Sequence, residues 1–130
     1  MLPLTLKILA PVFVLVGTLH LLLGVQADVL LGAQLSEAAI NDPVLDSQNR
    51  FYGVAFSAYG FLLFLAATDL AKYRVVFRIL LAVFFAAGCA RLVSIAVHGL
   101  PSVLVILLLA TELLLPPLLA WWHQQVLRHA

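Results

Sequence analysis

The chain has 130 residues, of which 65% are hydrophobic and only 10% are charged. A chain this short buries only part of its surface on folding, so a soluble fold could not hide so many apolar side chains. The net charge of +1 supplies no basic field for a polyanion. The composition therefore excludes a soluble enzyme, a nucleic-acid-binding protein and a disordered tail, and it indicates an integral membrane protein.

Four apolar stretches are long enough to cross a hydrocarbon core about 30 Å thick as helices. They cover about residues 4–25, 51–68, 75–97 and 103–122. None of them alternates apolar and polar residues as a membrane β-strand does. The first resembles a signal peptide but is too long for one, so we expect it to remain as a helix. The sequence predicts an all-α integral membrane fold, a four-transmembrane-helix bundle forming a single domain over residues 1–130.

The longest segment outside these stretches covers about residues 26–49. Apolar residues at helical spacing in its first part, 28–40, predict a short helix lying on the outer interface. Pro43 is expected to break any helix there, because proline disfavours the helical conformation of the residue before it. Asp46 is then the expected cap of the second transmembrane helix.

The second half of the sequence reads as a helical hairpin. Between its helices, Gly99 can take the left-handed position after a helix and Pro101 suits a helix start, which predicts a tight turn. Pro116 and Pro117 are expected to bend the fourth helix, since each lacks an N–H for the carbonyl four residues earlier. We expect Cys89 to be buried and inert, and His123 and His129 to lie in a solvated tail.

Basic residues predict the orientation of the chain. Lys72, Arg74 and Arg78 lie at the turn between the second and third helices. The segment between the first and second helices, about residues 26–49, contains acidic residues and no Lys or Arg. The positive-inside rule therefore predicts that both termini and this turn face the cytoplasm, an N-in/C-in topology. Arg50 is expected to anchor at the outer interface, with its charge in the headgroup region.

Two charges fall well inside the predicted spans, away from their ends, and they are Arg91 and Glu112. A charge at the centre of a membrane helix costs about 2.5–3.5 kcal/mol and needs a partner or a wet cavity. In an antiparallel hairpin turning near Gly99, these two residues lie at nearly equal depth at 1.5 Å per residue. The sequence therefore predicts an Arg91–Glu112 ion pair.

Other polar residues are expected to converge on the same depth. His20 lies between small residues on the first helix, Tyr59 lies on the second, and with Arg91 and Glu112 they are predicted to line one pocket. The full set of predicted ligand-binding residues is His20, Asn49, Arg50, Tyr52, Tyr59, Arg91, Ser94, His98 and Glu112.

The pattern leaves three roles open for the pair. Arg91 and Glu112 could fix helix register, because a buried ion pair is weak evidence for more than specificity. They could line a ligand pocket, or act in acid–base catalysis with Glu112 as general acid or base and Arg91 beside it. The sequence contains no phosphate loop, HExxH, GxSxG or paired-cysteine motif, so we predict no metal and no cofactor.

Three motifs together are similar to a known family. They are DSQNRFYGVAFSAYG at residues 46–60, RLVSIAVHGLPS at 91–102 and ELLLPPLL at 112–119. The chain resembles the small bacterial membrane proteins of domain-of-unknown-function family 4345, over nearly its whole length. The resemblance implies four membrane helices and no activity. It matches Asp46, Gln48, Asn49, Arg50, Tyr52, Gly53, Arg91 and Glu112 to the family pattern.

These observations favour a multi-pass protein of the bacterial inner membrane that binds a small lipophilic molecule, such as a lipid, quinone or isoprenoid-like compound. Arg91 and Glu112 would form the charged centre of the site. One alternative is an accessory subunit of a membrane complex, and another is a membrane isomerase or cyclase using Glu112. The expected partners are membrane lipids, the lipophilic ligand, and a second copy or a larger membrane complex, with no nucleic acid.

Overall fold

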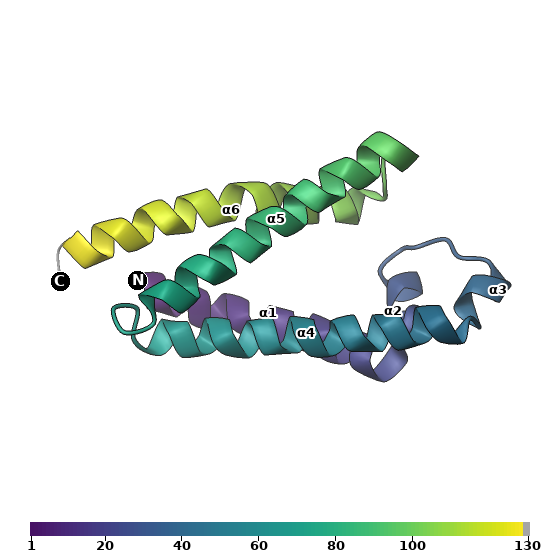
Figure 1. The fold of residues 1–130 in the computed structure, drawn as a ribbon, viewed down its shortest axis with the longest axis horizontal. Helices are drawn as coiled ribbons and strands as arrows, with labels where there is room; N and C mark the ends of the chain where they lie inside the picture. Colours follow the sequence, from purple (N-terminus) through teal and green to yellow (C-terminus); the bar gives the residue numbers. More distant parts are fainter. Residues whose placement is uncertain (129–130) are drawn as a thin grey trace. The chain divides into compact units, whose positions relative to one another are not determined.

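The computed structural model describes residues 1–128, and its regular secondary structure there is entirely helical. The helices in chain order are α1 (Leu2–Leu23), α2 (Val25–Leu30), α3 (Glu37–Ile40), α4 (Pro43–Thr68), α5 (Arg74–His98) and α6 (Val103–Arg128) (Figure 1). Four of them, α1, α4, α5 and α6, are 22 to 26 residues long and apolar enough to span a membrane. The predicted all-α class with four membrane-length helices is confirmed, and it indicates a multi-pass membrane protein.

The chain folds as two compact units. The first covers Leu4–Phe64, and the second runs from Leu65 onwards together with Met1–Pro3. The first unit therefore contains most of α1 and α4 with the two short helices between them, and the second contains α5 and α6. The packing of these units into a single bundle stays a prediction, as does the N-in/C-in orientation.

Glycines bring α1 and α4 into close antiparallel contact in the first unit. A Cβ on Gly17 would lie only 2.5 Å from the Ser57 nitrogen and 2.6 Å from the Gly53 oxygen. A Cβ on Gly60 of α4 would likewise lie 2.8 Å from the Ala10 oxygen of α1, seven residues before Gly17. Because any side chain would hold the backbones apart, these glycines allow the two helices to pack directly on each other.

The helix α4 begins at Pro43, about eight residues earlier than predicted. The Asp42 carboxylate caps it, with Oδ1 accepting from the backbone N–H groups of Val44 (2.8 Å) and Leu45 (3.0 Å). Pro43 occupies the first helical position, where its fixed φ is favourable and its missing N–H needs no partner. The prediction that Asp46 caps this helix is therefore wrong. The helix starts at Pro43, so Asp46 lies within its first turn.

The segment between α1 and α4 contains two short helices, where the sequence predicted one. α1 ends at Leu23, and Gly24 has a φ of +56° before α2 starts at Val25. Gly32, with a φ of +96°, lies between α2 and α3. Both glycines adopt backbone conformations that other residues rarely take, and they divide the segment into pieces too short for one interfacial helix.

The second unit is the predicted α5–α6 hairpin. Gly99 has a φ of +88°, and its N–H donates to the Ile95 carbonyl at 2.8 Å, which ends α5. α6 continues as helix through Pro116 and Pro117 to Arg128, beyond the predicted end near residue 122. Figure 1 shows α5 crossing α6.

Two side chains of this hairpin differ from expectation. His123 is 1% exposed; its Nε2 lies 3.3 Å from the Leu70 carbonyl oxygen, and its ring packs edge-on against Phe77. It is therefore a buried contact and not part of a solvated tail, because α6 extends past it. His129 lies outside the described residues. Cys89 is exposed on α5, so its predicted burial is also wrong.

Candidate functional site

Arg91 on α5 and Glu112 on α6 form the predicted ion pair. The Arg91 Nε donates to Glu112 Oε2 at 2.7 Å. The two ends of the pair differ in their surroundings, since the side chain of Glu112 is 5% exposed and that of Arg91 is 37% exposed. The carboxylate is thus buried between the helices, while the guanidinium reaches it from the surface of the hairpin.

Gly88 makes this short contact possible. It lies three residues before Arg91 and therefore on the same face of α5. A Cβ at this position would lie 2.8 Å from Leu113 Cδ2 and 3.0 Å from the Glu112 Cβ. The missing side chain allows α6 to approach α5 at the depth of Glu112, and the approach places the carboxylate within reach of Arg91.

The chemistry of the pair is asymmetric. A buried carboxylate must be compensated, and Arg91 supplies the compensating charge. A guanidinium has five N–H donors, and among residues 1–128 Glu112 is its one hydrogen-bond acceptor. The Glu112 backbone carbonyl has Pro116 four residues later, which offers it no N–H. The arrangement holds a cation firmly at one atom and leaves further donors for an external acceptor.

Arg50, by contrast, is held by several acceptors within the first unit. Its Nε donates to Asp46 Oδ2 at 2.7 Å, and its Nη1 donates to the carbonyl oxygens of Leu21 (2.9 Å) and Leu22 (3.0 Å). These carbonyls belong to the last turn of α1. Carbonyl groups in the last turn of a helix have no hydrogen-bond partner within the helix and carry partial negative charge. Arg50 therefore caps the C-terminal end of α1, which is more specific than the predicted interfacial anchor.

Asp46 completes this arrangement from the other side of the helix break. Its carboxylate lies against Gly24, directly before the start of α2, where a helix carries partial positive charge. A Cβ on Gly24 would overlap the Asp46 carboxylate. We call Asp46 and Arg50 the α1–α2 clamp, because Arg50 binds the end of α1 and Asp46, paired with Arg50, lies against Gly24 before the start of α2.

His20 lies beside the same break, with hydrogen-bond acceptors at both ring nitrogens. Nδ1 is 2.8 Å from the Val16 carbonyl oxygen, and Nε2 is 3.4 Å from Asp28 Oδ1 on α2. His20 therefore connects α1 to α2 through local partners.

The other predicted site residues lie apart from these contacts. The Asn49 amide donates at 3.5 Å to the Leu45 carbonyl of its own helix, and Tyr52 is 59% exposed beside Phe51. The Tyr59 ring packs on Phe13 with centroids 4.8 Å apart. Ser94 and His98 are both exposed on α5. A common pocket for His20, Tyr59, Arg91 and Glu112 stays a prediction, because the first two belong to one unit and the last two to the other.

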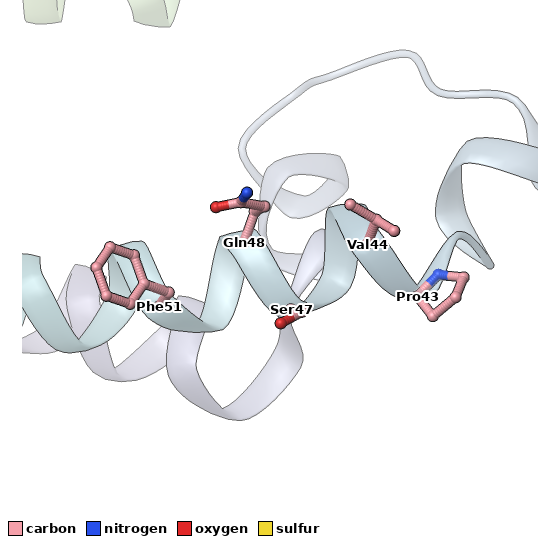
Figure 2. A pocket seen from close by; sticks show the side chains of 5 residues that line it. All are labelled: Pro43, Val44, Ser47, Gln48 and Phe51. Atoms are coloured by element: carbon pink, nitrogen blue, oxygen red, sulfur yellow. The ribbon is translucent and has the colours of Figure 1, made fainter.

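A surface hollow of about 500 Å³ lies beside the first turns of α4 (Figure 2). It is lined by Pro43, Val44, Ser47, Gln48 and Phe51, all from this one helix. Its polar side chains are Ser47 and Gln48, neither of which is charged. The predicted ligand residues Asn49, Arg50 and Tyr52 do not line it, so it supplies no charged centre for a site.

Sequence reasoning missed the roles of four residues in these contacts, although it named Asp46 as a cap and His123 as part of a tail. Asp46 precedes Arg50 by four residues, a spacing that places opposite charges together on a helix, and this signal was available. Gly88 precedes Arg91 by three residues, which also suggests a shared face. Asp28 and His123 give no such signal, because their partners come from the fold around them.

Comparison with known proteins gives a family and no activity. The family model described as Domain of unknown function (DUF4345) matches residues 1–123. No curated protein and no solved structure matches the chain.

Proposed function

Since the chain belongs to the family described as Domain of unknown function (DUF4345), whose description names no activity, we propose a function from the site itself. The protein binds a small lipophilic molecule within the membrane, and Arg91 holds the polar end of that molecule. Glu112 keeps the guanidinium in place from the buried side. The ligand would be a lipid, quinone or isoprenoid-like compound that carries a hydrogen-bond-accepting oxygen.

The observation that carries the proposal is the incomplete coordination of Arg91. A single hydrogen bond to Glu112 engages Nε, and 37% of the side chain is exposed. Since the predicted depth of Arg91 is inside the membrane, water is scarce there and an unused N–H donor is costly. An oxygen atom on a lipophilic molecule would accept hydrogen bonds from these donors. Binding would then be favourable, because it removes the free-energy cost of leaving the donors unpaired in the membrane.

The surface around the pair suits the apolar part of such a ligand. Ala87 on α5, one turn before Arg91, is exposed, and Leu108 on α6, one turn before Glu112, is 39% exposed. Ligand sites of this kind are mostly apolar with few polar groups that fix orientation. The ligand would lie against the hairpin with its polar end at Arg91.

The test is the set of small molecules that co-purify with the full-length protein. Protein extracted from its membrane in a mild detergent would be examined by native mass spectrometry, as wild type and as the double variant Arg91→Met, Glu112→Leu. This variant removes both charges together, so it avoids an uncompensated buried carboxylate. We expect wild type to carry a bound species that the double variant loses while its helical content is unchanged.

A matched control uses the Asp46–Arg50 ion pair. The double variant Asp46→Asn, Arg50→Gln removes the α1–α2 clamp and is expected to keep the bound species. Retention by the Arg91–Glu112 variant, or wild type without any bound species, would overturn the proposal. Either result would favour the structural alternative, in which the pair only fixes helix register beside Gly88.

We also propose the bacterial inner membrane as the location, with both termini in the cytoplasm. The distribution of basic residues and the resemblance in the sequence support this placement. A reporter that is active only in the cytoplasm, fused after the last residue, is expected to be active. An active periplasmic reporter at the same position would contradict the orientation.

A further inference from the structure

A shallow groove of about 340 Å³ runs along the α5–α6 hairpin, from one helical turn beyond Glu112 towards the start of α5. We call it the proline groove, because Pro116 and Pro117 form part of one wall. Its lining is apolar except at one position, and the lining residues are Arg78, Leu81, Ala82, Phe85, Pro116, Pro117 and Ala120. Ala82 on α5 and Ala120 on α6 are small, which leaves room for hydrocarbon against both helices.

Basic charge collects at the end of this groove. Arg74 precedes Arg78 by one helical turn, so both lie on the same side of α5, and Lys72 lies just before the helix. All three are exposed. The ion pairs among residues 1–128 involve other side chains, so no carboxylate neutralises Arg74 or Arg78. Like charges one turn apart repel each other, and an anion would relieve that repulsion.

We propose that the proline groove is a binding site for an anionic phospholipid. One acyl chain lies along the groove between α5 and α6, and Arg78, with Arg74 beyond it, contacts the phosphate. Basic pockets between membrane helices bind anionic headgroups in this way. The positive-inside rule places this end of α5 at the cytoplasmic leaflet, which is the leaflet whose anionic lipids attract basic residues near the membrane.

This site is separate from the one proposed at Arg91. Arg78 and Arg91 are thirteen residues apart, which is about 20 Å along an α-helix at 1.5 Å per residue. The groove selects by headgroup charge at the membrane surface, whereas Arg91 offers donors at membrane depth. The two sites can therefore be removed independently.

The experiment measures lipid retention on the full-length protein by native mass spectrometry. The probes are phosphatidylglycerol and phosphatidylcholine with identical oleoyl chains, added to delipidated protein in detergent. We expect wild type to retain phosphatidylglycerol in preference to phosphatidylcholine. Arg78→Gln should weaken phosphatidylglycerol retention by about fivefold, the size expected for one basic residue near an anionic lipid. Ala82→Leu should reduce the retention of both lipids by filling the groove.

Each variant has a control of the same chemistry. Lys7→Gln removes an exposed charge of α1, and Ala90→Leu enlarges an exposed alanine of α5 outside the groove; both should behave as wild type. The Arg91→Met, Glu112→Leu variant should also keep phosphatidylglycerol. Equal retention of the two lipids by wild type, or equal losses in variants and controls, would overturn the proposal. A dimer that Ala82→Leu dissociates would overturn it too, because a second copy would then occupy the groove.

Discussion

The two arginine–carboxylate pairs of this chain have similar distances and opposite surroundings. Arg50 and Arg91 each donate from Nε to a carboxylate oxygen at 2.7 Å. Arg50 also donates to two carbonyls at the end of α1, and the Asp46 carboxylate lies against Gly24, directly before α2. The α1–α2 clamp thus uses its charges to complete the backbone of a broken helix.

The Arg91–Glu112 pair completes no helix end. Its carboxylate is buried in the middle of α6, and its arginine has one acceptor among the described residues. The difference teaches that an ion pair near or inside a membrane indicates a ligand site only when the fold leaves donors unused. By that criterion the clamp is structural, and the Arg91–Glu112 pair is the candidate site.

The largest effect is expected from breaking the buried pair on one side. Arg91→Met leaves the Glu112 carboxylate buried without compensation, which should cost about 3 kcal/mol of stability. Thermal unfolding in detergent, followed by circular dichroism, measures the loss. The double variant Arg91→Met, Glu112→Leu should recover most of it, and a double variant no more stable than the single one would contradict this account.

The next effect distinguishes two glycines with positive φ. Gly24→Ala must place a methyl group in an unfavourable backbone conformation and against the Asp46 carboxylate. We expect a loss of about 2 kcal/mol. Gly99→Ala is the matched control, since a Cβ there meets nothing within 4 Å and only the backbone cost applies. Equal losses for the two variants would show that the clamp does not fill the space beside Gly24.

A smaller effect is expected where the hairpin helices approach each other. Gly88→Ala would press on the Leu113 side chain and the Glu112 Cβ, at a cost of about 1 kcal/mol because Leu113 can shift. The variant should also weaken retention of the ligand proposed at Arg91, since the two helices separate at the depth of Glu112. Unchanged stability and unchanged ligand retention together would argue against the role given to Gly88.

The smallest effect is expected at the exposed clamp. Arg50→Gln removes the ion pair and the cap on α1, but its side chain is 44% exposed, and exposed pairs contribute about 1 kcal/mol or less. The loss should shrink further at high salt, which screens exposed charges. Arg50→Lys should recover only part of it, because an ammonium cannot reach three acceptors with the geometry of a guanidinium. A loss as large as that of Arg91→Met would remove the contrast between the pairs.

Much of the local structure could be predicted from residue types alone. The spacing of Arg91 and Glu112 about Gly99 predicted their contact, because equal depth in an antiparallel hairpin depends only on the number of residues from the turn. Pro43 shows where this reasoning fails. A proline can end one helix or start another. The structure shows that Pro43 starts α4, because the Asp42 carboxylate accepts hydrogen bonds from the N–H groups of Val44 and Leu45.

The sequence by itself determined the four membrane-length helices, the hairpin and its buried ion pair. The length of an apolar stretch, the residues of a turn and the number of residues from that turn can all be read directly from the sequence. The membrane then requires each apolar stretch to form a helix. Only the tertiary structure decided that Arg50 and Asp46 cap a broken helix, that Gly88 brings α6 onto Arg91, and that His123 is buried against Phe77. These contacts depend on which faces of the helices meet, and hydrophobic periodicity carries little of that information in helices that are apolar on nearly every side.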